Sequence, residues 1–370
     1  MSFDEQDRPT NREKIIRAGT DFVEDFFADY YRFYDEQMRY KGFDHDRENF
    51  KAEEISINAA GLNHIGEHSS ARVLFPCRIR IPSVPISEKN KIDVTHFLRT
   101  LNLIEGESDY ISEYEDDEGQ RFWEFDAMVK EQVYDPKVEK EGYDVLRSLG
   151  IQTLVHLFPL DSDFGGGLEN RIRNASYTLT YIEKYLRPLS GMGLNELFIE
   201  HEGESVISEV FDILATLHEN GVIHGDPQFK NWGYKPSKGV FLFDPELLIN
   251  FRNINFYWRK NKAGMYNGGL GKYTELIDDK RDGLDKQGKI PLLWDKALID
   301  DIYLLLSGFI DKHRKINLDD HHREQLLNDA AKYITRVRKS GRMSDELMER
   351  VVEEFKEFVD IDQLRERLLT

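Results

Sequence analysis

The sequence predicts an α+β fold in which a smaller, strand-rich part is followed by a larger, helical part. Short apolar runs rich in β-favouring residues recur between residues 72 and 182, with turn residues between them. After residue 204 the apolar residues recur at helical spacing, and they do so again from 318 to 369. A chain of 370 residues is long enough to bury a sizeable core in two such parts.

Composition and charge argue against several classes of function. The 69 acidic and 50 basic side chains leave a net charge of −19, whereas a general nucleic-acid binder needs clustered Lys and Arg. No apolar run is long enough to span a bilayer, and the acidic N-terminus is unlike a signal peptide. Cys77 is the only cysteine, so no intrachain disulfide can form and a reducing compartment is expected. We therefore expect a cytoplasmic protein.

An accessory N-terminal region is expected over residues 1–90. Residues 11–40 have helical spacing with an aromatic stripe, which predicts a helix that packs on the following part or meets a partner protein. Residues 72–82 alternate like a half-buried strand that prolines interrupt and close. A polar linker over 83–91 then places the boundary near residue 90.

Residues 91–190 are expected to form the strand-rich part. Strands are predicted over 97–104, 110–114, 122–129, 151–160 and 177–182. The first two are joined by a turn at Gly106, where a phosphate-binding loop and a plain hairpin turn both fit, because the single glycine is flanked by acidic residues. Lys130 directly follows the third strand. A helix is predicted over 135–149, and its apolar face consists of Val138, Tyr143, Leu146 and Leu149.

Residues 191–370 are expected to form the helical part. A long helix is predicted over 204–220. The glycines between residues 261 and 288 predict a mobile segment. Candidate phosphorylation sites in that segment are Tyr266, Tyr273 and Thr274. A buried helix that begins with acidic residues is predicted over 300–308, and further helices are predicted over 318–369.

The residues with the most chemical meaning lie between positions 223 and 246, in the stretch IHGDPQFKNWGYKPSKGVFLFDPE. Asp226 ends an apolar run and Asn231 comes five residues later, so one loop carries a carboxylate and an amide oxygen. The apolar residues 239–243 predict a buried strand that places Asp244 at its end. Phosphoryl transfer needs such groups: a carboxylate to orient the acceptor hydroxyl, and oxygen ligands that hold Mg²⁺ against a triphosphate.

The spacing H-x-D-x-x-x-x-N, followed by a strand and a D-x-x turn, resembles the active-site core of the protein-kinase-like superfamily. The His-Gly-Asp form is similar to the aminoglycoside phosphotransferase, RIO-type and lipopolysaccharide-kinase branches. The resemblance implies a bilobal protein-kinase-like fold, with a small β-rich lobe and hinge at 91–190 and a larger helical lobe at 191–370. Where such kinases have D-F-G, this chain has Asp244-Pro245-Glu246, and the missing glycine argues against in/out switching of this acidic turn.

The resemblance also implies roles for residues of the large lobe. Asp226 corresponds to the catalytic aspartate, and Asn231 and Asp244 correspond to the metal ligands. Lys230 is expected to contact the transferring phosphate or to balance the charge of Asp226. Asp301 resembles an aspartate that holds the backbone of the catalytic loop, although a plain charge near the start of a helix is the alternative.

Nucleotide binding is implied for the small lobe. The expected residues are Lys130, Glu141, Gly106, Glu183 and Tyr185. Lys130, in the context Ala-Met-Val-Lys, resembles the strand lysine that neutralises the α and β phosphates of ATP. Its expected ion-pair partner is Glu141, with Glu139 as the alternative, because the predicted helix that follows carries both. The order of the elements makes residues 181–186 a hinge beside the adenine.

These features predict an atypical kinase that uses ATP and Mg²⁺ to phosphorylate a hydroxyl group. A protein Ser or Thr is the preferred acceptor, because the long region between Asp244 and Asp301 could hold a peptide. A small-molecule kinase acting on an aminoglycoside, a sugar or choline is the first alternative, and transfer of the nucleotide is another. A nucleotide-binding interaction module without catalysis, a pseudokinase whose residues 1–90 engage a partner protein, is an alternative of a different class.

Overall fold

The computed structural model describes residues 56–57, 74–82, 112–119, 121–132, 136–154, 156–157, 176–181, 186–201, 204–259, 266–277, 286–311, 314–315 and 318–369. The chain is mixed α/β and divides into two compact units. The first unit contains residues 1–136 and 154–184, and the second contains residues 137–153 and 185–370. The helix predicted over 11–40 and the strand predicted over 97–104 lie outside the described residues.

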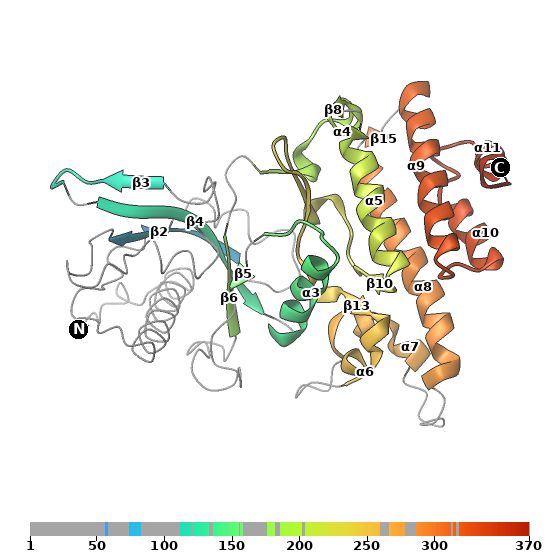
Figure 1. The fold of residues 1–370 in the computed structure, drawn as a ribbon, viewed down its shortest axis with the longest axis horizontal. Helices are drawn as coiled ribbons and strands as arrows, with labels where there is room; N and C mark the ends of the chain where they lie inside the picture. The colour runs from blue at the N-terminus through green and yellow to red at the C-terminus, as the bar shows by residue number, and fades with distance from the viewer. Residues whose placement is uncertain are drawn as a thin grey trace, which may run out of the picture. The chain divides into compact units, whose positions relative to one another are not determined.

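The first unit contains an antiparallel sheet in which β4 pairs with three other strands (Figure 1). The strands are β1 (Ser56–Ile57), β2 (Leu74–Pro82), β3 (Ser112–Glu115), β4 (Arg121–Gln132), β5 (His156–Leu157) and β6 (Ser176–Tyr181). Their order is β1-β2-β4-β6-β5, and β3 also pairs with β4. These strands confirm the predictions at 72–82, 110–114, 122–129 and 177–182, whereas the prediction at 151–160 is confirmed only at 156–157.

The second unit is mostly helical. Its helices are α3 (Pro136–Ser148, from Lys137 onward), α4 (Leu194–Phe198), α5 (Val206–Glu219), α6 (Ile254–Tyr257), α7 (Thr274–Ile277), α8 (Lys286–Leu306), α9 (Asp320–Lys339), α10 (Asp345–Glu354) and α11 (Ile361–Leu369). Helix α5 packs on α9, α8 packs on α10, and α11 packs on α9 (Figure 1). The helices predicted over 135–149, 204–220 and 318–369 are thereby confirmed.

Short strands and 3₁₀ turns connect the helices of the second unit. The strand pairs are β8 (Glu200–His201) with β9 (Glu204–Ser205), β10 (Val222–Ile223) with β13 (Ile249–Asn250), and β14 (Ile310–Asp311) with β15 (Arg314–Lys315). A three-stranded sheet has the order β12 (Gly239–Leu242), β11 (Trp232–Lys235), β7 (Arg187–Pro188). The 3₁₀ turns are η3 (Leu189–Gly191), η4 (Phe229–Asn231), η5 (Pro245–Leu247), η6 (Phe251–Asn253), η7 (Gly268–Tyr273) and η8 (Ser307–Phe309).

Helix α5 has clear sequence signals at both ends. The Ser205 side chain accepts the backbone N–H of Ser208 and so caps the first turn. At the other end Asn220 is the C-cap, and Gly221 follows with φ of +72°, a conformation that a glycine adopts without strain. Between these ends the helix buries one apolar face, made of Val206, Ile207, Val210, Phe211, Leu214 and Leu217. The chain therefore turns from α5 directly into the loop that carries Asp226.

Helix α8 is much longer than the sequence predicts. The predicted helix began with acidic residues at position 300, but α8 begins at Lys286 and contains Pro291. A proline near the start of a helix removes a single hydrogen bond, and here the cost is offset by burial of the apolar residues that follow, including Leu293 and Leu298. Asp301 consequently lies well inside the helix rather than at its first turn.

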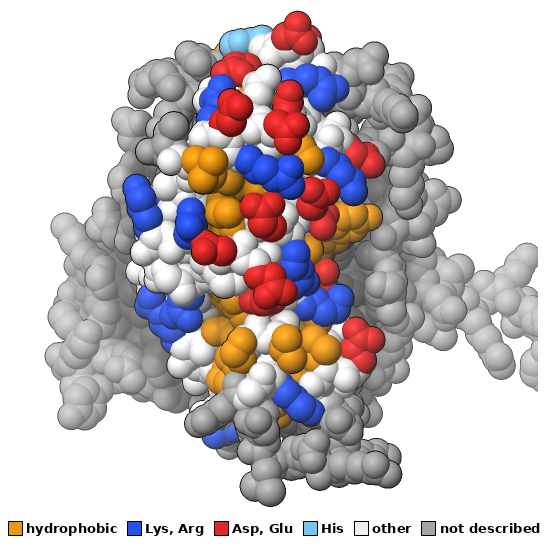
Figure 2. Space-filling model, turned by 90° about the vertical axis from the view of Figure 1, so that its right-hand side faces the viewer, with side chains coloured by type: hydrophobic (Ala, Val, Ile, Leu, Met, Phe, Trp, Pro, Cys, Tyr) orange, Lys and Arg blue, Asp and Glu red, His pale blue; other side chains and the backbone are white. Residues whose placement is uncertain are grey.

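The outer face of the C-terminal helices carries acidic and basic side chains next to one another, with apolar residues between them (Figure 2). Ion pairs join neighbouring helices there: Arg365 of α11 lies 3.2 Å from Glu349 and 3.0 Å from Glu353, both on α10. Such exposed pairs contribute little to stability individually, about 0–1 kcal/mol each. Among the residues that the structure describes, no helix is long and apolar enough to cross a membrane.

Candidate active site

The backbone of the loop that carries Asp226 is held by Asp301, a fully buried residue of α8. The carboxylate of Asp301 accepts the N–H of His224 at Oδ2 and the N–H of Gly225 at Oδ1, both at 2.8 Å. Two buried backbone donors are thereby satisfied by one charged acceptor, an arrangement that orders the loop. The predicted contact of Asp301 with this backbone is confirmed, and the alternative of a charge near a helix start is wrong.

A buried histidine and a buried tyrosine extend the contacts of Asp301. His218 Nε2 lies 3.3 Å from Asp301 Oδ2, and His218 Nδ1 lies 2.5 Å from the hydroxyl of Tyr333. Burial, together with the charge of Asp301, raises the pKa of Tyr333, so its hydroxyl keeps its proton and donates to Nδ1. Nε2 then carries the histidine proton and donates to Asp301. This network connects α9, α5 and α8 to the loop.

His224 connects the same loop to the strand that ends at Asp244. Its Nδ1 accepts the backbone N–H of Asp226 at 3.3 Å, and its Nε2 lies 3.2 Å from the carbonyl oxygen of Phe243. Burial lowers the pKa of His224, although the carboxylates of Asp301, Asp226 and Asp244 act in the opposite direction. The ring is therefore neutral, with the proton on Nε2, and it acts as a structural bridge.

Two neighbouring side chains orient the carboxylate of Asp226. Asn231 Nδ2 donates to the backbone oxygen of Asp226 at 2.7 Å and to its Oδ2 at 3.1 Å. Lys230 Nζ lies 3.3 Å from the same Oδ2, on a side chain that is 58% exposed. Both contacts involve Oδ2, so Oδ1 is the oxygen that these residues leave for an acceptor hydroxyl. The predicted neighbours of Asp226 thus meet in one loop.

A hairpin brings Asn231 next to the end of strand β12. Strands β11 and β12 pair antiparallel, with Trp232 opposite Leu242, and the N–H of Phe243 donates to the carbonyl oxygen of Asn231 at 3.0 Å. Asp244 is the next residue, so the amide and the carboxylate predicted to bind metal flank one turn of the chain. The pairing follows from the mostly apolar, buried residues of both strands.

Asp244 has an unusual backbone conformation. Its φ of 60° and ψ of 52° are left-handed, and among the described residues no other residue except glycine has a positive φ. This conformation costs an L-residue roughly 1–2 kcal/mol, although aspartate tolerates it better than most. Pro245 follows with its fixed φ and begins η5. Such strain concentrates at functional sites, where the surrounding packing maintains it.

The side chains at this turn suit a hard cation such as Mg²⁺, which prefers oxygen ligands. The amide nitrogen of Asn231 is directed at Asp226, which leaves its amide oxygen as the atom for a ligand. Asp244 supplies a carboxylate at the residue after Phe243, whose N–H donates to the carbonyl oxygen of Asn231. Within the described ranges no group of three or more His, Cys, Asp or Glu side chains could hold a metal, so a metal here would also need oxygens from a phosphate or from water.

Three glycines join the loop, the acidic turn and the segment after it. A Cβ at Gly225 or at Gly269 would clash with the carbonyl oxygen of Leu247, and a Cβ at Gly268 would lie 2.5 Å from that of Leu248. Gly268 and Gly269 are themselves buried in η7. These two glycines, which the sequence suggested as part of a mobile segment, permit close packing of one backbone on another.

Lys272 is a residue of this site that the sequence did not predict. It lies on η7, is exposed, and donates from Nζ to the carbonyl oxygen of Gly225, the residue before Asp226. The two positions are 47 residues apart in sequence. The one sequence signal was the run of glycines that precedes Lys272, since glycines at close intervals allow a segment to approach another backbone.

Helix α3 packs directly against the acidic turn. A Cβ at Gly142 would lie 2.7 Å from the carbonyl oxygen of Pro245, so only glycine fits there. Glu141 Oε1 accepts from Asn253 Nδ2 at 3.4 Å, whereas Glu139 is 1% exposed. Glu141, the expected partner of Lys130, therefore contacts the segment after the acidic turn, and the burial of Glu139 keeps that alternative open.

Several predicted residues cannot be located in this site. Gly106, Glu183 and Tyr185 lie outside the described residues. Lys130 lies inside β4 rather than at its end, paired with Leu74 and Thr178, and its side chain is outside the described part. Of the candidate phosphorylation sites, Tyr266 and Tyr273 are buried and Thr274 is exposed.

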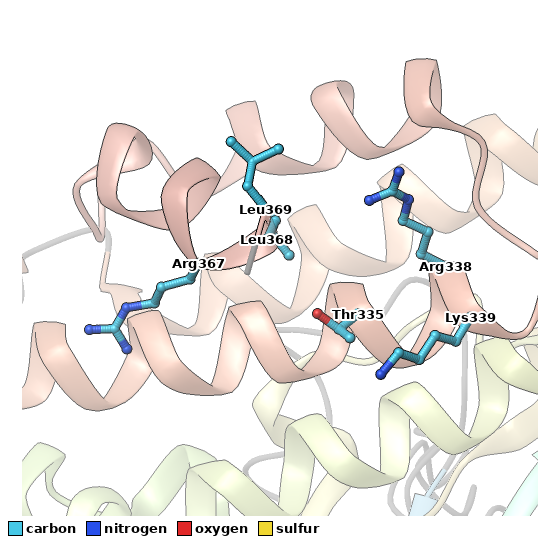
Figure 3. Close-up of a pocket in the computed structure, with 6 residues that line it drawn as sticks. All are labelled: Thr335, Arg338, Lys339, Arg367, Leu368 and Leu369. Carbon is cyan, nitrogen blue, oxygen red and sulfur yellow. The ribbon is translucent and has the colours of Figure 1, made fainter.

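A separate hollow of about 350 Å³ lies between α9 and α11, and none of the predicted site residues lines it. Its lining residues are Thr335, Arg338, Lys339, Arg367, Leu368 and Leu369 (Figure 3). Arg338 pairs with Asp345 at 2.8 Å, and Arg367 pairs with Glu324 at 2.5 Å. Two of the three basic residues that line the hollow are thus already paired with carboxylates.

Comparison with known proteins adds no assignment to this geometry. The site consists of Asp226, Lys230, Asn231 and Asp244, held by His224 and Asp301, with Lys272 beside the loop. Its chemistry therefore rests on these side chains and their contacts. No protein-family model matches the chain, and no curated protein is significantly similar to it in sequence.

Proposed function

We propose that this chain is an ATP- and Mg²⁺-dependent phosphotransferase with a bilobal protein-kinase-like fold. The observation that carries the proposal is the pairing of the Asp226 loop with the turn at Asp244 through one hairpin and one buried histidine. The presence of one unit with an antiparallel sheet and a second, mostly helical unit supports the proposal. The acceptor is a hydroxyl group, with a protein Ser or Thr preferred.

The proposed reaction is an in-line displacement at phosphorus. The acceptor oxygen forms a bond to the γ-phosphorus of ATP while the bond from that phosphorus to the β,γ-bridging oxygen breaks, and ADP leaves with the electron pair. Asp226 Oδ1 orients the acceptor hydroxyl and receives its proton, which passes on to water. The contacts of Oδ2 with Asn231 and Lys230 fix the direction of the carboxylate.

The remaining residues supply positioning and charge. Mg²⁺, when bound, neutralises the phosphate oxygens and is proposed to be held by Asp244 and Asn231. The exposed ammonium of Lys230 lies close enough to Asp226 to contact the transferred phosphoryl group. Lys130 is proposed to bind the α and β phosphates, with Glu141 or Glu139 as its partner. Gly106, Glu183 and Tyr185 remain proposed nucleotide contacts.

The test measures phosphate transfer from ATP to a generic protein acceptor in the presence of Mg²⁺. The transfer is monitored by the intact mass of the acceptor and by the release of ADP. The wild type should add phosphoryl groups, and Asp226→Asn should slow transfer by about 10²–10⁴-fold, the usual contribution of a positioned base. Asp144→Asn is the matched control, since Asp144 is an exposed residue of α3 that pairs with Lys140.

The other possible functions give different results in the same assay. ADP released only when small alcohols or sugars are added would favour a small-molecule kinase, and a mass increase of one nucleotide would show nucleotidyl transfer. Absence of ADP release with every acceptor would contradict the proposal and leave a nucleotide-binding interaction module. A wild-type rate equal to that of Asp226→Asn would contradict it as well.

A further inference from the structure

Lys272 is fixed at its backbone but exposed at its side chain. The glycines before it pack on the carbonyl groups of Leu247 and Leu248, and Tyr273 after it is buried. Its ammonium donates to the carbonyl oxygen of Gly225. The position of the Lys272 backbone is therefore set by packing on the acidic turn, and its cation is presented beside the catalytic loop.

The contact with Gly225 does little to explain why a lysine stands there. Ordering a lysine side chain costs up to about 2 kcal/mol of rotamer entropy, and a hydrogen bond from a charged donor contributes about 1.5–3 kcal/mol. The two effects nearly cancel for an exposed side chain. The ammonium has three N–H groups, and within the described part of the chain its hydrogen-bond acceptor is this one carbonyl. The cation is thus available to a bound anion.

The charges around Asp226 are not those of the chain as a whole. The chain has a net charge of −19, yet two exposed lysines lie beside Asp226. Lys230 contacts the Asp226 carboxylate, and Lys272 contacts the carbonyl oxygen of Gly225, the residue before it. Acidic side chains also lie near η7: Glu275 is exposed on α7, and Asp300, which contacts Tyr273, is paired with Lys296 at 3.9 Å. The Lys296 pair reduces the effect of Asp300 on the loop.

We propose that Lys272, together with Lys230, selects an acceptor segment that carries negative charge next to its hydroxyl, namely a protein Ser or Thr flanked by acidic residues. The inference rests on the proposed phosphotransferase activity and names the acceptor class of that site. An anion next to the hydroxyl would otherwise be repelled by Asp226 and by the phosphates. The ammonium of Lys272, which contacts the residue before Asp226, offsets that repulsion. The same positive charge disfavours acceptors that carry an amine.

The test compares three peptides that differ only in the residues beside a single Ser: Asp, Asn or Lys. At saturating ATP and Mg²⁺, the wild type should have the highest kcat/KM for the Asp-flanked peptide. Lys272→Ala should lower that value about tenfold through KM for the peptide, as expected for loss of one charge-assisted contact, and should lower the value for the Asn-flanked peptide by a smaller factor. Lys272→Arg should retain the preference, and Lys272→Glu should shift it towards the Lys-flanked peptide.

Lys356→Ala, which removes an exposed lysine after α10, is the control and should behave like the wild type. Equal use of the three peptides by the wild type, or an equal loss on all three in Lys272→Ala, would overturn the inference while leaving the phosphotransferase intact. Phosphorylation of a small hydroxy acid in place of every peptide would also overturn it. Absence of ADP release with any acceptor would instead remove the proposed function, and this inference with it.

Discussion

The carboxylate of Asp301 accepts the backbone N–H of His224 at 2.8 Å across 77 residues of sequence. The second oxygen of the same carboxylate holds Gly225, so a long helix fixes the start of the loop that carries Asp226. A buried carboxylate is stable there because backbone donors and His218 surround it. The loop geometry thus depends on a residue that contacts no proposed substrate.

Asp301→Asn should destabilise the protein and slow catalysis. The asparagine keeps one acceptor oxygen, so one of the two buried N–H groups loses its partner, at a cost of about 1–3 kcal/mol. Urea unfolding with and without the substitution measures the loss. Asp295→Asn is the control, because Asp295 lies on the same helix and pairs loosely with Arg350 at 3.9 Å. Equal stability of the two variants would show that the loop does not depend on Asp301.

Gly142→Ala should destabilise the acidic turn even though alanine favours helices. The gain in helix propensity is about 0.5–1 kcal/mol, but the new methyl group would lie 2.7 Å from the carbonyl oxygen of Pro245, and such overpacking costs about 1–3 kcal/mol. The net loss in urea unfolding should be up to about 2.5 kcal/mol, and ATP turnover should fall as the turn shifts. Gly191→Ala, where the nearest atom lies 3.8 Å away, is the control. A more stable variant with full turnover would contradict this account.

The local part of the site could be predicted from the sequence, and the distant part could not. Asp226, Asn231 and Asp244 lie within one loop and hairpin, so their spacing and the apolar strand between them determine how they meet. Lys272 and Gly142, the glycine of α3 that contacts Pro245, join this site through packing of one backbone on another. A single sequence shows that glycines are present, but not which backbone approaches them.

The register of a helix is also hard to predict when apolar residues do not define a narrow face. In α3 the buried residues include Glu139 and Gly142 as well as Val138, Tyr143 and Leu146, so the apolar spacing alone could not decide between Glu139 and Glu141. In α8 the sequence predicts a helix only over 300–308, but the helix begins at Lys286 and runs through Pro291, because burial of the following turns outweighs one missing hydrogen bond. Both cases show tertiary packing overriding a local signal.

Substitutions at Asp244 should separate its backbone strain from its chemistry. Asparagine tolerates the left-handed conformation nearly as well as aspartate does, so Asp244→Asn should leave the free energy of unfolding within about 0.5 kcal/mol. Asp244→Ala should cost about 1–2 kcal/mol, because an alanine Cβ is disfavoured at φ of 60°. Both variants should lose Mg²⁺-dependent ATP turnover. Turnover that survives in Asp244→Asn would show that no carboxylate ligand is needed at this turn.

Acid should destabilise the protein through His224. Burial lowers the pKa of His224 from its ordinary value of 6.5, against the pull of Asp301, Asp226 and Asp244. The unfolded chain therefore binds a proton below pH 6.5 that the folded protein excludes, so stability is full above that pH and falls as the pH drops towards the folded pKa. The expected slope is at most about 1.4 kcal/mol per pH unit. Urea unfolding without Mg²⁺ should show this slope in the wild type and in the control His321→Gln, which replaces an exposed histidine. His224→Gln should show a shallower slope, although the glutamine amide can still donate to the carbonyl oxygen of Phe243. Identical slopes in all three proteins would mean that His224 is not the group responsible.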